Sequence, residues 1–178
     1  MIDNFRSIFR AYGGWNSLWR SSYIRLSAIL TIVCFQIAIS EKWTEISLSV
    51  LPSMLGFSIA AIAIVTVIGD DGFRKSLSKV STISDKFSDL ESLMASFVWF
   101  IIVQVSTVIY SVAFSSKPYD FCKINNNESC RDYNVTANMI MSYIGTFFTI
   151  YSILLVISST ILMFQLFRLY IRNIPDSE

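Results

Sequence analysis

Four long apolar runs decide what this chain can fold into. They cover residues 23–43, 44–69, 94–114 and 138–167, and together they take up more than half of the 178 residues. A membrane-spanning helix needs roughly 20 predominantly apolar residues, and each run reaches that length. With 53% hydrophobic residues and a mean hydropathy of +0.55, the composition exceeds that of soluble proteins. The sequence therefore predicts an all-α integral membrane protein, a single membrane domain with four transmembrane helices.

The segments outside these runs are short, and two of them have helical periodicity. In residues 1–22, apolar side chains from Ile2 to Tyr12 fall on one helical face, which predicts an amphipathic helix at the membrane interface. Residues 70–93 have a second amphipathic pattern, which predicts a cytosolic helix. This helix has three possible roles: it lies on the membrane, packs under the bundle, or docks a cytosolic protein. Residues 115–137 are expected to form the one sizeable outer loop, and residues 168–178 a cytosolic tail.

The basic residues predict the orientation. With the amino terminus inside, ten of the 14 lysines and arginines lie in cytosolic segments and four in outer segments. This positive-inside bias, with an even number of spans, places both termini in the cytosol. No secretory signal peptide is evident before residue 23, so the first span is expected to be retained. We expect a multi-pass protein of the bacterial inner membrane, in contact with the lipid bilayer.

The cysteines are consistent with this orientation. Cys122 and Cys130 lie eight residues apart in the predicted outer loop, where an oxidising compartment favours a disulfide. Two unpaired thiols are the alternative, because the sequence does not give the geometry that a disulfide requires. Cys34 lies inside the first run and is interpreted as a small apolar core residue.

Two of the predicted helices carry stripes of small residues. In the second run the stripe steps by three or four, and in the fourth run it steps by three, four or seven, so each lies on one helical face. Such stripes let helix backbones approach closely in membranes, either inside a protomer or between protomers. The predicted packing and oligomerisation residues are Ser49, Ser53, Gly56, Ala60 and Ala63 in the second run, and Ser142, Gly145, Thr149, Ser152 and Ser159 in the fourth. We interpret the stripes as two halves of a packing pair in a homo-oligomer, with a tetramer as the expected assembly.

The polar groups at membrane depth are neutral. Gln36 and Gln104 are the candidate pore-lining residues, although such groups also join helices by hydrogen bonds. The acidic pair Asp70 and Asp71 follows the second run, and Glu41 and Glu45 precede it. Each of these carboxylates is either a cation contact or a solvated charge at a helix end.

The sequence lacks the common motifs of enzyme active sites. It contains no histidine, which excludes His general bases, Ser-His-Asp triads and His-ligated metals. Its three cysteines give no zinc pattern, and its six glycines give no phosphate-binding motif. The charges lie in short segments beside the membrane, which argues against direct nucleic-acid binding. We therefore expect no enzymatic activity, no metal and no cofactor.

Residues 51–73, LPSMLGFSIAAIAIVTVIGDDGF, combine the pattern LPxxLGFS with small and β-branched residues and a Gly-Asp-Asp-Gly-Phe exit. This stretch and the four-span plan resemble the small inner-membrane proteins of bacterial antiphage defence, in particular the membrane subunit of the Kiwa system. The resemblance implies a homo-oligomer that senses a phage-induced change of the envelope and signals to a cytosolic DNA-binding partner.

These observations predict an oligomeric inner-membrane sensor or scaffold subunit of antiphage defence. A rigid second helix leads directly into the cytosolic helix, so we expect the partner to be contacted by Asp70, Asp71, Arg74, Lys75 and Lys79. The alternative is an oligomeric pore, a toxin-like effector that permeabilises or depolarises the membrane.

Overall fold

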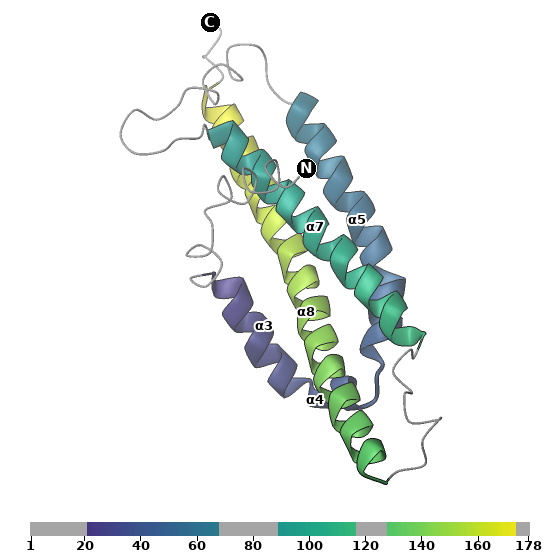
Figure 1. The fold of residues 1–178 in the computed structure, drawn as a ribbon. Coiled ribbons are helices and arrows are strands. Elements are labelled where there is room, and N and C mark those ends of the chain that lie inside the picture. The colour runs from purple at the N-terminus through teal and green to yellow at the C-terminus, as the bar shows by residue number, and fades with distance from the viewer. Residues whose placement is uncertain (1–20, 68–88, 117–127, 174–178) are drawn as a thin grey trace, which may run out of the picture. The chain divides into compact units, whose positions relative to one another are not determined.

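The structure, a computed structural model, describes residues 21–67, 89–116 and 128–173 (Figure 1). Every regular element in these residues is an α-helix. The elements are α3 (Ser22–Val33), α4 (Phe35–Ile39), α5 (Trp43–Val67), α7 (Asp89–Ser115) and α8 (Glu128–Asn173). The predicted amino-terminal helix and most of the predicted cytosolic helix at 70–93 lie outside the described residues.

In the part of the chain that the structure describes, three helices are long and apolar enough to cross a membrane. The qualifying segments are Trp43–Val67, Ser92–Ser115 and Val135–Arg168. A helix satisfies all of its interior backbone hydrogen bonds internally, which is why apolar sequences of this length form helices in lipid. The shortest, with 24 residues, is about 36 Å long at 1.5 Å per residue, which exceeds a hydrocarbon core of about 30 Å. These helices indicate a membrane protein.

The first predicted span, 23–43, differs from the structure. It is divided into the 12-residue α3 and the 5-residue α4, with a break at Cys34, where ψ is 29°. The preceding Thr31, Ile32 and Val33 are all β-branched, and such side chains lose rotamer freedom in a helix. By itself α3 is about 18 Å long, too short to cross the hydrocarbon core.

The predicted loop at 115–137 also differs, because α8 already begins at Glu128. Its 46 residues make it about 69 Å long, more than twice the thickness of a hydrocarbon core. The sequence-based span of 138–167 therefore covers only the apolar middle of a longer helix. In the second predicted span, α5 continues without a break through Pro52.

The chain divides into two compact units, each built from parts of several helices. The Trp43 unit comprises Ser22–Leu55 and Val103–Leu154, and the Phe97 unit comprises Met1–Ser21, Gly56–Ile102 and Leu155–Glu178. In the Phe97 unit, the rings of Phe97 and Phe100 meet edge to face with centroids 6.1 Å apart. Among the residues of this unit that the structure describes, the other buried apolar side chains are Ala61, Val65, Ala95, Leu155 and Leu166.

Candidate functional site

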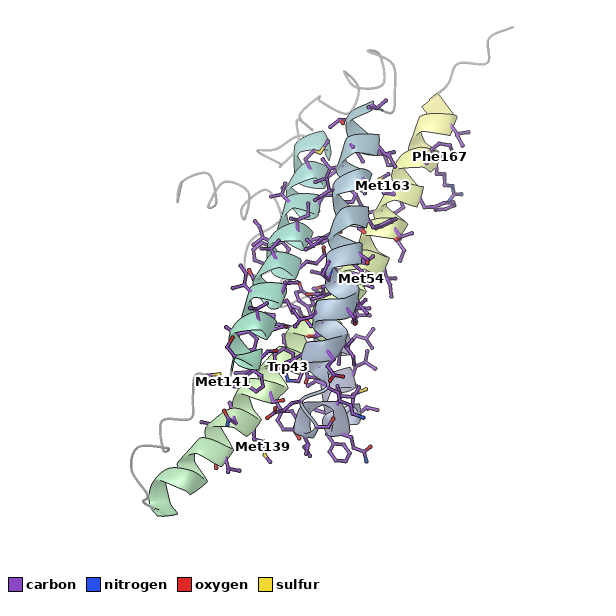
Figure 2. The ribbon with its side chains drawn as sticks, turned by 90° about the vertical axis from the view of Figure 1, so that its right-hand side faces the viewer. Trp43, Met54, Met139, Met141, Met163 and Phe167 are labelled. Carbon is purple, nitrogen blue, oxygen red and sulfur yellow. The ribbon has the colours of Figure 1, made fainter. Side chains whose placement is uncertain are left out.

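The best-defined constellation of side chains surrounds Trp43, the first residue of α5, in the Trp43 unit. A turn at residues 40–42 leads from α4 into α5, and Glu41 in this turn has a positive φ of 56°. Glycine commonly takes this left-handed position after a helix. Trp43 is fully buried, and Figure 2 shows it at the beginning of α5 beside α8.

One hydrogen-bonded chain joins three helices at this point. The indole N–H of Trp43 donates to the hydroxyl of Ser142 on α8 at 2.8 Å. The Ser142 hydroxyl in turn donates to the backbone carbonyl of Ala38 on α4. Both bonds are buried, and a buried polar group that loses its partner is costly. The chain therefore fixes α4, α5 and α8 in one register.

Aromatic rings complete the surroundings of Trp43. Its ring stacks on Tyr110 of α7, with centroids 5.7 Å apart, and meets Phe114 at 5.1 Å. Such pairs contribute about 0.5–1.5 kcal/mol beyond the burial of their area. The Tyr110 hydroxyl donates to the carbonyl of Met141 at 2.9 Å, so the same cluster also joins α7 to α8.

Gly145 on α8 makes room for the Trp43 ring. A Cβ added at Gly145 would lie 2.3 Å from Cη2 and 2.4 Å from Cζ2 of Trp43. These distances are well below van der Waals contact, and the buried ring is held by its hydrogen bond to Ser142. The missing side chain of Gly145 therefore leaves the space that the Trp43 ring occupies.

Further along the unit, hydroxyl groups bridge pairs of helices. The hydroxyls of Ser47 on α5 and Ser111 on α7 lie 2.7 Å apart, and those of Thr107 on α7 and Ser152 on α8 lie 3.0 Å apart. Thr107 donates its own proton to the carbonyl of Val103, so Ser152 is the donor in the second bridge. All four hydroxyl side chains are buried, and their hydrogen-bonding capacity serves helix packing.

The bridge between Thr107 and Ser152 gives the first testable prediction. Replacing Thr107 by valine keeps the shape but removes the acceptor of the Ser152 proton. Interhelical hydrogen bonds of this kind contribute about 0.6 kcal/mol on average and up to about 1.7 kcal/mol. We expect a coupling energy in that range from a double-mutant cycle of Thr107→Val and Ser152→Ala, measured by unfolding in detergent. Thr160→Val is the control, because Thr160 is exposed and its hydroxyl donates to the carbonyl of Val156 within the same helix, α8. A coupling energy of zero would contradict this role of the bridge.

The predicted stripe on α8 is buried throughout. This holds for Ser142, Gly145, Thr149, Ser152 and Ser159. Inside the Trp43 unit its partners are Trp43, Ala38 and Thr107. The predicted stripe on α5 has the opposite environment, since Ser49, Ser53, Gly56, Ala60 and Ala63 are all exposed. Within the Trp43 unit, the exposed Ser49 and Ser53 of α5 are therefore separate from the buried part of the α8 stripe, which packs around Trp43. The pairing of the two stripes stays a prediction.

The two candidate pore-lining residues have different environments. Gln36 on α4 is exposed, whereas Gln104 on α7 is fully buried. Within the Trp43 unit they do not share a solvent-facing surface. Gln104 lies one helical turn before Thr107 and belongs to the packed interior.

The remaining predicted sites fall largely outside the described residues. These are Asp70, Asp71, Arg74, Lys75, Lys79 and Cys122. Cys130 belongs to α8, but its side chain is outside the described set, so the disulfide stays a prediction. Cys34 is a free thiol at the break between α3 and α4. The described residues include no group of three or more His, Cys, Asp or Glu side chains that could hold a metal ion.

Sequence reasoning missed the central residue of the cluster. The sequence places Trp43 at the end of the first predicted span, and it predicts no role for Ser47, Tyr110 or Ser111. One usable signal was present, because Thr107 and Ser111 are four residues apart and so share a face of α7. The partner of that face depends on contacts between residues as far apart as Trp43 and Ser142, which periodicity does not reveal.

Comparison of the chain with protein-family models, with curated proteins and with solved structures finds no match.

Proposed function

We propose that the protein is an oligomeric sensor or scaffold subunit of the bacterial inner membrane, acting in antiphage defence. In this proposal it couples a perturbation of the envelope to a cytosolic partner and catalyses no reaction. The three apolar helices support a position in the membrane. The resemblance of residues 51–73 to defence-associated four-span proteins supports the biological setting.

The exposed stripe of α5 is the observation that supports the proposed homo-oligomer. Its five small residues face away from the buried residues of the same helix, Ser47, Leu51, Ser58, Ala61 and Val65. At Gly56, an added Cβ meets nothing within 4 Å. Folding of the chain therefore does not require a small residue there. Close approach of a second copy's backbone does require one, and stripes of this spacing serve that purpose in membranes.

The Gly56→Leu variant tests this assembly. A leucine at Gly56 would hold two helix backbones apart, so we expect the variant to fold and to lose the oligomer. The measurement is the particle mass after extraction in native lipid, with the thermal unfolding midpoint of the protomer as a check on folding. Thr66→Leu is the matched control, because Thr66 is exposed on α5 but lies off the stripe. An oligomer of normal mass from Gly56→Leu would remove the basis of the proposed interface.

Signalling is proposed to leave the bundle through the segment that follows α5. Asp70→Asn and Asp71→Asn are expected to preserve the oligomer and to weaken protection against phage. Charge reversal at Arg74, Lys75 and Lys79 is expected to release the cytosolic partner in co-purification. Normal protection and a retained partner in all of these variants would contradict the proposed contact.

A measurement of the membrane potential distinguishes the proposed sensor from the alternative, a pore. The buried hydroxyls of the Trp43 unit are engaged in hydrogen bonds between helices, which favours packing over a water-filled path. We therefore expect the potential to hold when the protein is expressed and the cell is challenged with phage. Collapse of the potential, abolished by Gln104→Leu without loss of the oligomer, would establish the pore instead.

A further inference from the structure

The turn between α4 and α5 lies at one surface of the hydrocarbon core. Three charged residues, Glu41, Lys42 and Glu45, gather at this turn, whereas the rest of α4 and α5 carries no charge. Charged side chains are costly inside a bilayer, so a turn of this composition belongs at its surface. Trp43 lies at the same level, where tryptophan is enriched in membrane proteins.

Arg25 lies far from this surface. The hydroxyl of Ser142 bonds both Ala38 and the Trp43 indole, so α4 is held at the level of Trp43. Figure 1 shows α3 extending from α4 in the same direction as the first half of α5. Arg25 precedes Ala38 by 13 residues, which is about 20 Å of helix, and the break at Cys34 and any tilt shorten this depth. In a hydrocarbon core of about 30 Å, the opposite surface is therefore about 10 Å or more from Arg25.

The side of α3 that carries Arg25 faces away from the interior of the Trp43 unit. Arg25 is exposed, and Ile29 and Ile32 follow it at helical spacing on the same face, where they are 58% and 73% exposed. The opposite face of α3 carries the buried Ser27 and Thr31. Arg25 thus lies on the face of α3 that contacts lipid.

The described side chains of the Trp43 unit supply no counter-charge at this depth. The acidic residues among them are Glu41 and Glu45, which lie at the other surface. An arginine in contact with lipid is accommodated when headgroups and water move inward and the bilayer becomes locally thinner. The guanidinium also forms two parallel hydrogen bonds to a phosphate group. A lipid phosphate is therefore the complementary partner of Arg25.

We propose that Arg25 binds the phosphate of a phospholipid in the leaflet farther from Trp43, and that the bilayer is thinned beside α3. The arginine side chain extends toward the surface over part of the distance, and the headgroup moves inward over the rest. The 18 residues Ser22–Ile39 of α3 and α4 span about 27 Å at most, which suits a thin bilayer. The residues proposed for assembly and signalling lie outside α3, so the inference is independent of the proposed function.

Two matched positions report the polarity of the bilayer. Ile29 precedes Ala38 by nine residues, and Val105 of α7 precedes Phe114, which packs on Trp43, by nine residues. Both side chains are exposed, and both lie about 14 Å from the Trp43 level. In a bilayer of uniform thickness, both positions therefore lie near the centre of the hydrocarbon core.

The probe is a fluorescent amino acid whose emission depends on polarity, placed at position 29 or 105 of the full-length protein in bilayers of phosphatidylglycerol and phosphatidylcholine. We expect emission at a longer wavelength, the polar signature, from position 29, because the headgroup held by Arg25 lies one helical turn away. Arg25→Leu should shift this emission to the wavelength of position 105, whereas Arg25→Lys keeps the charge and should retain the polar signal. Lys42→Leu is the matched control and should change nothing at position 29, because Lys42 is exposed at the Trp43 level. Equal wavelengths at the two positions, or no shift in Arg25→Leu, would overturn the proposal.

Lipid retention tests the phosphate contact. The full-length protein is placed in nanodiscs containing equal amounts of phosphatidylglycerol and a galactolipid that has no phosphate, and the lipids that stay bound after extraction are identified by native mass spectrometry. Loss of a hydrogen bond to a charged group weakens binding about tenfold or more. We therefore expect Arg25→Leu to retain one phosphatidylglycerol molecule fewer than the unsubstituted protein at an unchanged unfolding midpoint, and Arg25→Lys to retain it. An unchanged number of phosphatidylglycerol molecules in Arg25→Leu, or loss of a galactolipid instead, would overturn the proposal.

Discussion

Replacing Trp43 by alanine is expected to lower the free energy of unfolding by about 3–5 kcal/mol, the usual range for removing a large buried aromatic side chain. The indole is fully buried, stacks on Tyr110, packs on Phe114 and donates to Ser142. Its loss leaves a cavity where α4, α5, α7 and α8 meet. The measurement is denaturant-induced unfolding of the purified protein in detergent.

The Trp43→Phe variant separates packing from hydrogen bonding. Phenylalanine fills part of the space, and Ser142 keeps its bond to the Ala38 carbonyl. We therefore expect Trp43→Phe to be less destabilising than Trp43→Ala. Unfolding of Trp43→Ala at the same denaturant concentration as the unsubstituted protein would show that the cluster does not hold this unit together.

Replacing Gly145 by alanine is expected to destabilise the protein by about 1–3 kcal/mol, the usual cost of overpacking a core. The new methyl group would lie 2.3–2.6 Å from three atoms of the Trp43 ring, so the ring or α8 has to shift. Gly56→Ala is the matched control. Nothing lies within 4 Å of its added Cβ, and alanine favours a helix over glycine by about 1 kcal/mol. The two substitutions are thus expected to have opposite signs in the same unfolding experiment.

A double variant identifies the cause of the Gly145 effect. If the clash is with the Trp43 ring, Gly145→Ala should add little further destabilisation in a Trp43→Ala background. Contacting residues are coupled in this way, whereas distant residues have additive effects. Additive costs in the double variant would assign the Gly145 requirement to something other than Trp43.

The sequence predicted the elements of this fold that depend on composition. Apolar length alone identified the helices that became α5, α7 and α8, because a membrane solvent favours long, internally hydrogen-bonded apolar helices. Apolar length did not reveal the break at Cys34, since residues on both sides of it are apolar. It also did not place the beginning of α8, because residues 128–134 are polar and helical at once.

The interior of the Trp43 unit was predictable only in part. The regular spacing of Ser142, Gly145, Thr149 and Ser152 correctly placed these residues on one face, and that face is buried. The spacing of Gly56, Ala60 and Ala63 is just as regular, yet that face is exposed. Helical periodicity defines a face but not its partner. At Ser142 and Gly145 that partner is Trp43, whose ring occupies the space that Gly145 leaves.

The most direct test of the proposed assembly is cysteine cross-linking across the exposed face of α5 in native membranes. Disulfides require Cα atoms about 4.4–6.8 Å apart, a separation that only closely packed backbones reach. Ala60→Cys lies on the stripe and Thr66→Cys lies off it, and both positions are exposed on the same helix. We expect oxidation to convert the Ala60→Cys protein into a covalent dimer and to leave the Thr66→Cys protein like the unsubstituted one. A monomeric Ala60→Cys protein, or equal cross-linking at the two positions, would contradict the proposed assembly.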